Sequence, residues 1–241
     1  MRINSLVENL PEGAEVLALP PEESHHLARV LRVQSGQEIT LFDGRGAVAE
    51  AQVEQVAKNR VEVRVLRQWK EPPPAVQIEL FQALPKPDRW DLILQKAVEL
   101  GASAIHPMLT RHTQFQPTPK KEARWQKIIS NAAQQCEVRW IPPLTKAQKL
   151  EAFLPSLAEY DLALMGSLEA GAKPLRDLLE TPLPEKGARV AILIGPEGDF
   201  SPEELEGMAD AGAIPVSFGT RILRTETAAI FALSALACKW M

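Results

Sequence analysis

Cysteine is scarce in this chain: only Cys136 and Cys238 occur among its 241 residues, and they stand far apart. This scarcity argues against a disulfide-stapled fold and predicts a reducing compartment, so we expect a cytoplasmic protein. Long apolar runs are also lacking, both in the N-terminal stretch MRINSLVENLPEG and elsewhere. We therefore expect no signal peptide and no membrane-spanning segment.

Patterns typical of metal or phosphate chemistry are absent as well. His25 and His26 are adjacent, His106 and His112 are isolated, and none has the spacing of a zinc site. The sequence contains no Walker-type phosphate loop, no dinucleotide-binding glycine fingerprint and no nucleophile elbow. We expect no metal, and a nucleotide-dependent α/β enzyme or a triad hydrolase is disfavoured.

Positive charge is in slight deficit, with a net charge of −4 and a pI near 5.7. This balance argues against a generic nucleic-acid binder, which needs positive surface to contact phosphates. From Thr110 to Trp140, however, six basic residues stand against two acidic ones. This stretch predicts either one RNA-binding face or an ordinary solvated helix surface, and both interpretations stay open.

The first 70 residues predict a small β domain with one helical interruption. The interruption is Pro21–Leu31, and turn signals stand at Asp43–Gly46 and Lys58-Asn59. Several short strands at this spacing favour a barrel, which removes exposed sheet edges. The expected strands are Val16–Leu19, Glu38–Phe42, Ala47–Val53 and Val61–Leu66.

A proline-rich joint, Glu71–Pro74, separates this domain from a second one over residues 75–241. Beyond the joint, strand-forming and helix-forming segments alternate, which predicts an α/β fold with a parallel sheet covered by helices on both faces. The expected segments are Val76–Ala83, Asp88–Leu100, Ala104–Met108, Lys120–Cys136, Asp161–Met165 and Leu175–Glu180.

Two further apolar runs near the end of the chain each break at a glycine-bearing loop that leads into a helix. Ile192–Ile194 is followed by Gly195–Gly198 (GPEG), and Val216–Phe218 is followed by Gly219–Arg221. In open α/β sheets, ligands bind beyond the carboxyl ends of the strands, where glycine lets the backbone approach them. The two loops therefore predict a cofactor pocket built mostly from backbone. The alternative is a pair of ordinary strand-to-helix turns.

Helix-start signals follow both loops. Ser201–Glu204 (SPEE) predicts a capping box with proline at the first helical position. Thr225 predicts the N-cap of a final helix that runs toward Trp240. Because Ser234 and Lys239 interrupt the apolar surface of this helix, it predicts a buried or subunit-contacting element rather than a membrane segment.

This part of the chain resembles a known family. It is similar to the small-subunit ribosomal RNA methyltransferases that modify N3 of a uridine. The motifs that carry the resemblance are GPEG, the S-x-x-E of the capping box and Ile222–Thr227 (ILRTET). The resemblance extends to Asp91–Gly101 (DLILQKAVELG), His26–Val33 and Leu41–Gly44, and so covers nearly the whole chain. The family belongs to the SPOUT class. The resemblance implies a C-terminal domain with a trefoil knot that binds S-adenosylmethionine, an N-terminal PUA-like RNA-binding barrel, and a homodimer that uses the last helix.

The resemblance also implies which loops hold the cofactor. The side chains of Met165, Ile222 and Leu223 would enclose the adenine, although core packing is the alternative for Met165 and Leu223. Backbone groups near Gly195, Gly219 and Leu223 would satisfy its polar edge. The full expected set is Leu164, Met165, Gly166, Ile194, Gly195, Pro196, Glu197, Gly198, Phe218, Gly219, Arg221, Ile222, Leu223 and Thr227.

Methylation at N3 of uridine requires loss of a proton, after which the base carries negative charge on its oxygens. A fixed cation stabilises such charge, and Arg224 is the candidate. Glu226 is a candidate proton acceptor. The alternatives are an ion pair of Arg224 with Glu226 or Glu197, and a helix-dipole role for Glu226. The expected RNA contacts are Arg29, Arg32, Lys86 and Arg111.

One position departs from the family pattern. Gln134, within Ala132–Cys136, stands where the family has glutamate, which puts the substrate contacts of this region in doubt. The expected partner is small-subunit ribosomal RNA or a ribosomal particle. The alternatives are a knotted methyltransferase that acts on another RNA position and a non-catalytic ribosome-assembly factor.

Overall fold

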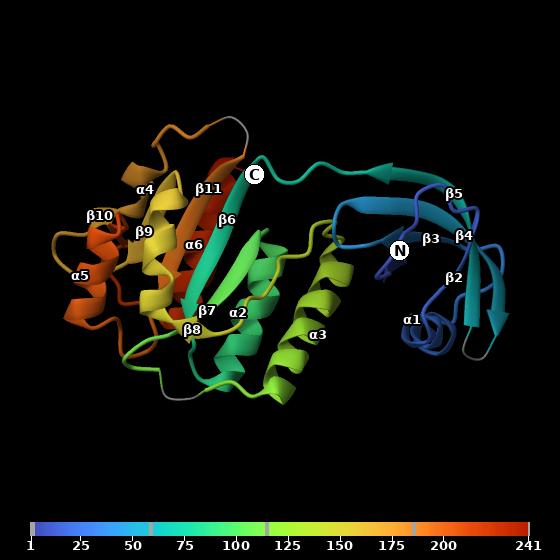
Figure 1. The fold of residues 1–241 in the computed structure, drawn as a ribbon, viewed down its shortest axis with the longest axis horizontal. Helices are drawn as coiled ribbons and strands as arrows, with labels where there is room; N and C mark the ends of the chain where they lie inside the picture. Colours follow the sequence, from blue (N-terminus) through green and yellow to red (C-terminus); the bar gives the residue numbers. More distant parts are fainter. Residues whose placement is uncertain (1–2, 58–59, 114–115, 185–186, 241) are drawn as a thin grey trace. The chain divides into compact units, whose positions relative to one another are not determined.

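The computed structural model describes residues 3–57, 60–113, 116–184 and 187–240 (Figure 1). The chain forms two compact units. The first comprises Met1–Pro73 together with Ser130–Ile141, and the second comprises Pro74–Ile129 and Pro142–Met241. The sequence predicted residues 75–241 as one domain, but the segment Ser130–Ile141 lies in the first unit.

The first unit contains a five-stranded sheet. Its strands are β1 (Asn4–Leu6), β2 (Val16–Ala18), β3 (Glu38–Phe42), β4 (Ala47–Ala57) and β5 (Arg60–Lys70). They are ordered β1-β3-β4-β5-β2, and only the β1–β3 pair is parallel. The expected turn at Lys58-Asn59 lies outside the described residues. Within the described part of this unit, β1 and β2 are the sheet edges, so closure into a barrel stays a prediction.

The helical interruption of the first unit begins as the α-helix α1 (Pro21–His25) and continues as the π-helical turn η1 (His26–Leu31). Leu27 of η1 is fully buried in the core of the unit. The buried hydroxyl of Ser24 donates to Leu19 O at 3.0 Å and accepts from Val61 N at 3.0 Å. The helix is thereby fixed to strand β5.

Segment Ser130–Ile141 belongs to the first unit because it binds the turn between β3 and β4. Gly46 N donates to Arg139 O at 3.1 Å, and Ile141 N donates to Gly44 O at 2.9 Å. Trp140 lies so close to Gly46, whose φ is +93°, that a Cβ there would be 2.6 Å from the indole ring. Any side chain at this position would therefore displace the tryptophan.

The second unit contains a seven-stranded sheet in which every described pairing is parallel, as predicted. Its strands are β6 (Val76–Ala83), β7 (Ala104–Leu109), β8 (Gln148–Lys149), β9 (Leu162–Gly166), β10 (Lys173–Pro174), β11 (Ala188–Ile194) and β12 (Ile214–Ser217). Their spatial order is β10-β12-β9-β11-β6-β7-β8. The central strand β11 thus pairs with β6 on one side and β9 on the other. The trefoil knot stays a prediction.

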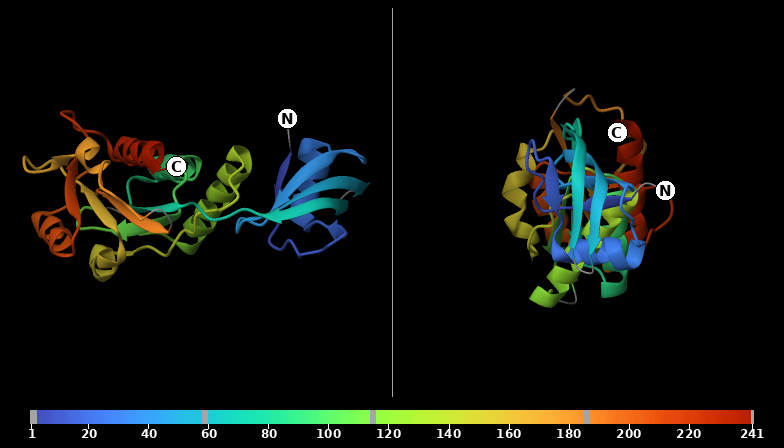
Figure 2. Two further views of the ribbon diagram at one scale, coloured as in Figure 1. Left: turned by 90° about the horizontal axis from the view of Figure 1, so that it is seen from above. Right: turned by 90° about the vertical axis from the view of Figure 1, so that its right-hand side faces the viewer.

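Both faces of this sheet are covered, again as predicted (Figure 2). One face packs against α2 and α6, and the other against η2, η3 and α5. Across the described part of the chain, no helix has the length and apolar character needed to cross a membrane. The remaining helical bounds are α2 (Pro87–Glu99), α3 (Pro119–Cys136), η2 (Leu150–Ala152), η3 (Leu154–Glu159), α4 (Leu175–Leu178), α5 (Pro202–Asp210) and α6 (Thr225–Trp240).

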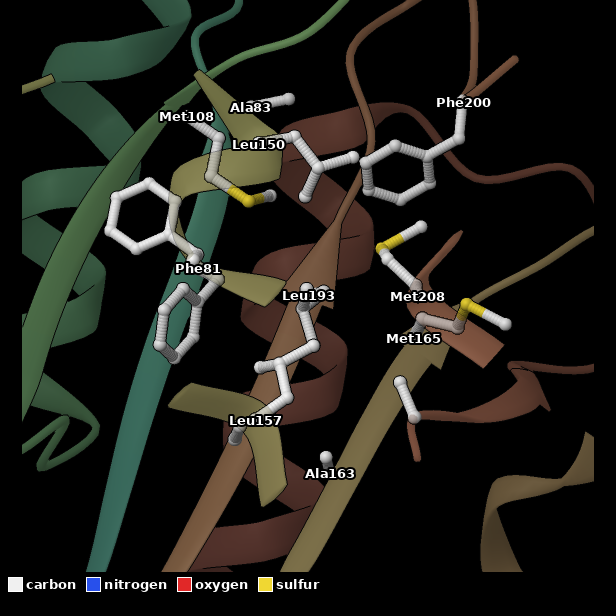
Figure 3. Packing of buried hydrophobic residues seen from close by; sticks show 13 residues of the cluster. Phe81, Ala83, Met108, Leu150, Leu157, Ala163, Met165, Leu193, Phe200 and Met208 are labelled. Carbon is white, nitrogen blue, oxygen red and sulfur yellow. The ribbon is translucent and has the colours of Figure 1, made fainter. Parts of the chain in front are cut away.

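The core on the α5 side of the sheet is an apolar cluster (Figure 3). Phe81, Met165 and Leu193 project from three neighbouring strands and meet Leu157 of η3 and Met208 of α5. All five side chains are almost completely buried. This packing holds β6, β9 and β11 in fixed positions relative to one another, and so positions the loops that follow β9 and β11.

A buried carboxylate, Glu79 of β6, lies among three polar side chains in the second unit. Glu79 Oε2 is 2.8 Å from His106 Nε2 and 2.6 Å from Tyr160 Oη, and Glu79 Oε1 is 3.0 Å from Arg189 Nη2. Burial alone would raise the pKa of Glu79, but the hydrogen bonds from His106, Tyr160 and Arg189 outweigh it and lower the pKa to about 2. Burial and the contact with Glu79 also raise the pKa of the Tyr160 phenol.

Replacing Glu79 with glutamine is expected to lower the free energy of unfolding by about 3 kcal/mol at neutral pH, because Arg189 loses its buried anion. The pKa of Glu79 in the folded protein lies below the ordinary value of 4.5, so its stabilisation is present above that pH and is lost as the pH falls toward 2. Denaturant titrations at about pH 7 and about pH 3 should therefore show the difference between wild type and variant shrinking in acid.

The matched control is Asp177→Asn, whose carboxylate pairs with the exposed Arg176 at 3.3 Å. This change is expected to alter the unfolding free energy by less than about 0.5 kcal/mol. Equal losses for the two variants, or a Glu79→Gln effect that does not change with pH, would contradict the assignment.

Candidate functional site

A pocket of about 540 Å³ opens at the carboxyl ends of β9, β11 and β12, where the glycine loops were predicted to meet. This volume is in the range of small-molecule sites. The lining comes from the loops after these three strands, from the start of α6 and from Arg89 of α2. All of these elements belong to the second unit.

Most of the predicted cofactor residues are brought together in this lining. Ile222 is 81% exposed at the pocket, and Leu223 is half-buried there. Leu223 therefore lies at the pocket and is not packed in the core, which was the alternative interpretation of this residue. The predicted residues that line the pocket are Gly166, Ile194, Gly195, Pro196, Glu197, Phe218, Gly219, Arg221, Ile222, Leu223 and Arg224.

Four of the predicted cofactor residues lie outside the lining, as does the predicted catalytic residue Glu226. Leu164 and Met165 are buried in β9, and Met165 packs in the apolar cluster beside Met208 (Figure 3). The core-packing alternative therefore applies to Met165, because its side chain is buried in the cluster on the α5 side of the sheet. Gly198 faces His112, and Thr227 is exposed on α6.

At two pocket glycines, Gly195 and Gly166, neighbouring groups come so close that a side chain would press against them. A Cβ on Gly195 would lie 3.2 Å from Asp199 Oδ1 and 3.3 Å from the Phe200 ring. A Cβ on Gly166 would lie 3.0 Å from the Phe218 ring. The helix that follows the first loop has the predicted capping box, since both reciprocal bonds between Ser201 and Glu204 are formed.

The second helix start differs from the prediction. Ala228 N donates to Arg224 O at 2.8 Å, so Arg224 occupies the N-cap position and Thr225 is the first helical residue. The Thr225 hydroxyl donates instead to Gly195 O at 2.6 Å and accepts from Gln82 Nε2 at 3.0 Å. The prediction of Thr225 as N-cap was wrong, because its hydroxyl ties α6 to the other glycine loop.

The charged residues of the pocket also have an unexpected arrangement. Arg224 is exposed and makes no ion pair with any described residue, so neither predicted pairing, with Glu226 or with Glu197, is formed. Arg89 pairs with both carboxylates instead. Sequence reasoning missed Arg89. Its position in the first turn of α2 could have indicated it, because the helix dipole disfavours a cation there unless the cation has an anionic partner.

The four predicted RNA-binding residues are exposed, two in each unit. Arg29 lies on η1 and Arg32 follows it with a left-handed φ of 53°. Lys86 precedes α2, and its backbone N–H donates to Glu197 Oε1 at 3.2 Å. The guanidinium of Arg111 is within 3.2 Å of Glu203 on α5.

The basic stretch from Thr110 to Trp140 is partly engaged in structural contacts. Arg124 pairs with Asp91, and Arg139 lies 3.2 Å from Asn4 Oδ1 and 5.2 Å from the centre of the Phe42 ring. These two arginines therefore support the interpretation as ordinary structure rather than as an RNA-binding face. Gln134 is partly buried in the same segment, and Arg139 obtains its partners without it.

Within the described residues, no group of three or more histidine, cysteine or acidic side chains is arranged to hold a metal ion. His106 is stacked on Phe81 with ring centroids 4.3 Å apart and is bonded to Glu79. His112 Nδ1 is 2.8 Å from Asp199 O and so supports the loop after β11.

Fold and pocket together define a two-part protein, with a small β unit and an α/β unit that offers a ligand site at its strand ends. The chain belongs to the RNA methyltransferase family. Residues 71–237 match the model of the RNA methyltransferase domain, and residues 19–66 match that of the RNA methyltransferase PUA domain. The N-terminal unit is therefore PUA-like, as predicted.

Named relatives agree along nearly the whole chain. The chain is 31% identical to ribosomal RNA small subunit methyltransferase E of Mycobacterium bovis, over 95% of this chain and 89% of the relative. It resembles the crystal structure of the enzyme of that name from Neisseria gonorrhoeae bound to S-adenosyl methionine, with a TM-score of 0.90, 30% identity and coverage of 100% and 98%. A putative methyltransferase from Legionella pneumophila, solved with the bound cofactor SAM, matches with a TM-score of 0.88, 35% identity and coverage of 99% and 98%.

Proposed function

We propose that the protein transfers a methyl group from S-adenosylmethionine to N3 of a uridine in small-subunit (16S) ribosomal RNA. The observation that carries this proposal is the pocket at the ends of β9, β11 and β12, where the GPEG and ILRTET loops meet in a chain of the RNA methyltransferase family. Two similar structures that hold S-adenosylmethionine support the same cofactor here.

The residues present fit this cofactor. The pocket has the required volume, its glycine loops offer backbone groups, and Phe218, Ile222 and Leu223 provide apolar surface for an adenine. A Cβ at Gly219 would have no atom within 4 Å, so open space lies above this loop. When bound, S-adenosylmethionine supplies a methyl group made electrophilic by its positively charged sulfur.

The chain itself supplies position and charge. The bond from Thr225 to Gly195 O holds the GPEG loop to the start of α6, and a pocket fixed in this way would hold the cofactor in position. Arg224, exposed at the pocket and without an ion-pair partner among the described residues, is proposed to stabilise the negative charge that develops on the uracil oxygens. Glu226 is buried and paired with Arg89, which argues against its role as the proton acceptor.

The remaining elements of the proposal concern the architecture and the partners. We propose residues 1–70 as an RNA-binding barrel and residues 75–241 as a knotted methyltransferase domain, with RNA contacts at Arg29, Arg32, Lys86 and Arg111. The insertion of β9 and β11 between β12 and β6 is compatible with a knotted topology. A cytoplasmic homodimer is proposed, supported by Phe231, which is 45% exposed on the apolar helix α6.

The proposal is tested by mass spectrometry of digested ribosomal RNA from a deletion strain. Loss of one 3-methyluridine from small-subunit RNA, restored by the wild-type gene, is the expected result. Loss of a different methyl group with 3-methyluridine intact would favour the alternative of another RNA position. Failure of the purified protein to bind S-adenosylmethionine in calorimetry would favour the non-catalytic assembly factor.

A further inference from the structure

Arg89 contacts two of the elements that form the pocket, the GPEG loop and the start of α6. It lies in the first turn of α2, lines the pocket and has a side chain that is 27% exposed. Its Nη1 donates to Glu226 Oε1 at the start of α6, and its Nε is 3.8 Å from Glu197 Oε1 in the GPEG loop. One guanidinium thus connects three elements that are distant in sequence.

The contact with Glu226 anchors the start of α6. The Glu226 side chain is only 11% exposed, and its Oε2 has no hydrogen-bond partner within the described structure. A buried carboxylate of this kind depends on its cation. The preceding residue, Thr225, is the one whose hydroxyl holds Gly195 O. The ion pair and the threonine bond therefore secure the same turn from two sides.

The contact with Glu197 anchors the other loop. Glu197 Oε1 also accepts the backbone N–H of Lys86 at 3.2 Å, so the first turn of α2 approaches this carboxylate with both a peptide group and a guanidinium. Glu197 is 40% exposed and lines the pocket. Arg89 Nε forms no hydrogen bond to any described residue, so the guanidinium attracts this pocket-lining carboxylate electrostatically while the Lys86 N–H supplies the hydrogen bond.

We propose that Arg89 is a positioning residue of the methyl-transfer site, which sets the distance between the GPEG loop and the start of α6. This inference rests on the proposed function, because it assigns the braced pocket to S-adenosylmethionine. A displacement of about 1 Å in such a site is enough to weaken binding and chemistry strongly. The residue acts through Glu197 and Glu226 rather than on the reacting atoms.

The test measures S-adenosylmethionine affinity by calorimetry and thermal stability without ligand on four variants. Arg89→Met is expected to raise the Kd about tenfold or more and to lower the Tm, whereas Arg89→Lys, which keeps the charge, retains part of the affinity. The double variant Arg89→Met/Glu226→Gln removes the buried carboxylate as well. It is expected to recover stability but not affinity, since Glu197 then keeps only the Lys86 N–H and still lacks the guanidinium. Arg124→Met breaks another ion pair of α2, to Asp91, and should leave the Kd unchanged.

Two results would overturn the inference. One is a Kd for Arg89→Met within twofold of wild type. The other is recovery of both stability and affinity in the double variant, because a purely structural ion pair predicts that outcome. If the wild-type protein itself binds no S-adenosylmethionine, the proposed function fails. If the wild type binds and the variants bind equally well, only the role of Arg89 fails.

Discussion

Replacing Arg224 with methionine is expected to lower kcat for methyl transfer by about 10²- to 10³-fold while the affinity for S-adenosylmethionine changes little. Arg224 is an exposed cation at the pocket that no described carboxylate neutralises, and it directly precedes α6, so we expect its charge to be available to the uracil as N3 loses its proton. Methionine keeps the length of the side chain and removes the charge. Single-turnover transfer of a labelled methyl group to small-subunit ribosomal RNA measures the effect.

Arg224→Lys serves as the companion variant, because it preserves the positive charge and loses only the planar set of donors. Its kcat is expected to fall between those of the wild type and Arg224→Met. Calorimetry with S-adenosylmethionine confirms that both variants keep an intact pocket. A kcat for Arg224→Met within threefold of wild type would remove Arg224 from the reaction.

Replacing Gly195 with tryptophan is expected to abolish S-adenosylmethionine binding. Even a Cβ at this position comes within 3.2 Å of Asp199 Oδ1 and 3.3 Å of the Phe200 ring, so the indole must enter the pocket or push these groups aside. A rise in Kd of about 100-fold or more, measured by calorimetry, is the expected result. Methyl transfer should be lost in parallel.

Gly171→Trp provides the matched control for this change. Gly171 lies in the second unit outside the pocket lining, and a Cβ there would have no atom within 4 Å. This variant should fold and bind S-adenosylmethionine like the wild type. Wild-type affinity in Gly195→Trp would mean that the cofactor binds elsewhere.

The parts of the structure that local sequence determines were predictable. The capping box at Ser201 depends on four consecutive residues, and it is formed as predicted. The glycine loops follow short, mainly apolar strands, and parallel strands place such loops at one edge of the sheet. Most residues of the pocket could therefore be named from the sequence.

Contacts between distant segments could not be predicted, because no local pattern encodes them. Arg89 and Glu226 are 137 positions apart, and nothing in either neighbourhood indicates the other. The binding of Trp140 to the turn at Gly46 likewise depends on a fit between surfaces. Strands such as β8 and β10, with two residues each, are too short to show alternation. Thr225 matched the N-cap signal because that signal does not include a competing acceptor such as Gly195 O.

The order of strands in the parallel sheet affects how the protein folds during its synthesis on the ribosome. Strand β6 is made early, but its neighbour β11 begins only at Ala188. Until the ribosome has synthesised that segment, one edge of β6 has no partner, and residues such as Ile78 and Leu80 lack half of their final surroundings. Such late pairing makes closure slow and leaves the emerging chain prone to aggregation. We therefore expect the nascent polypeptide to engage chaperones until its last third has left the exit tunnel.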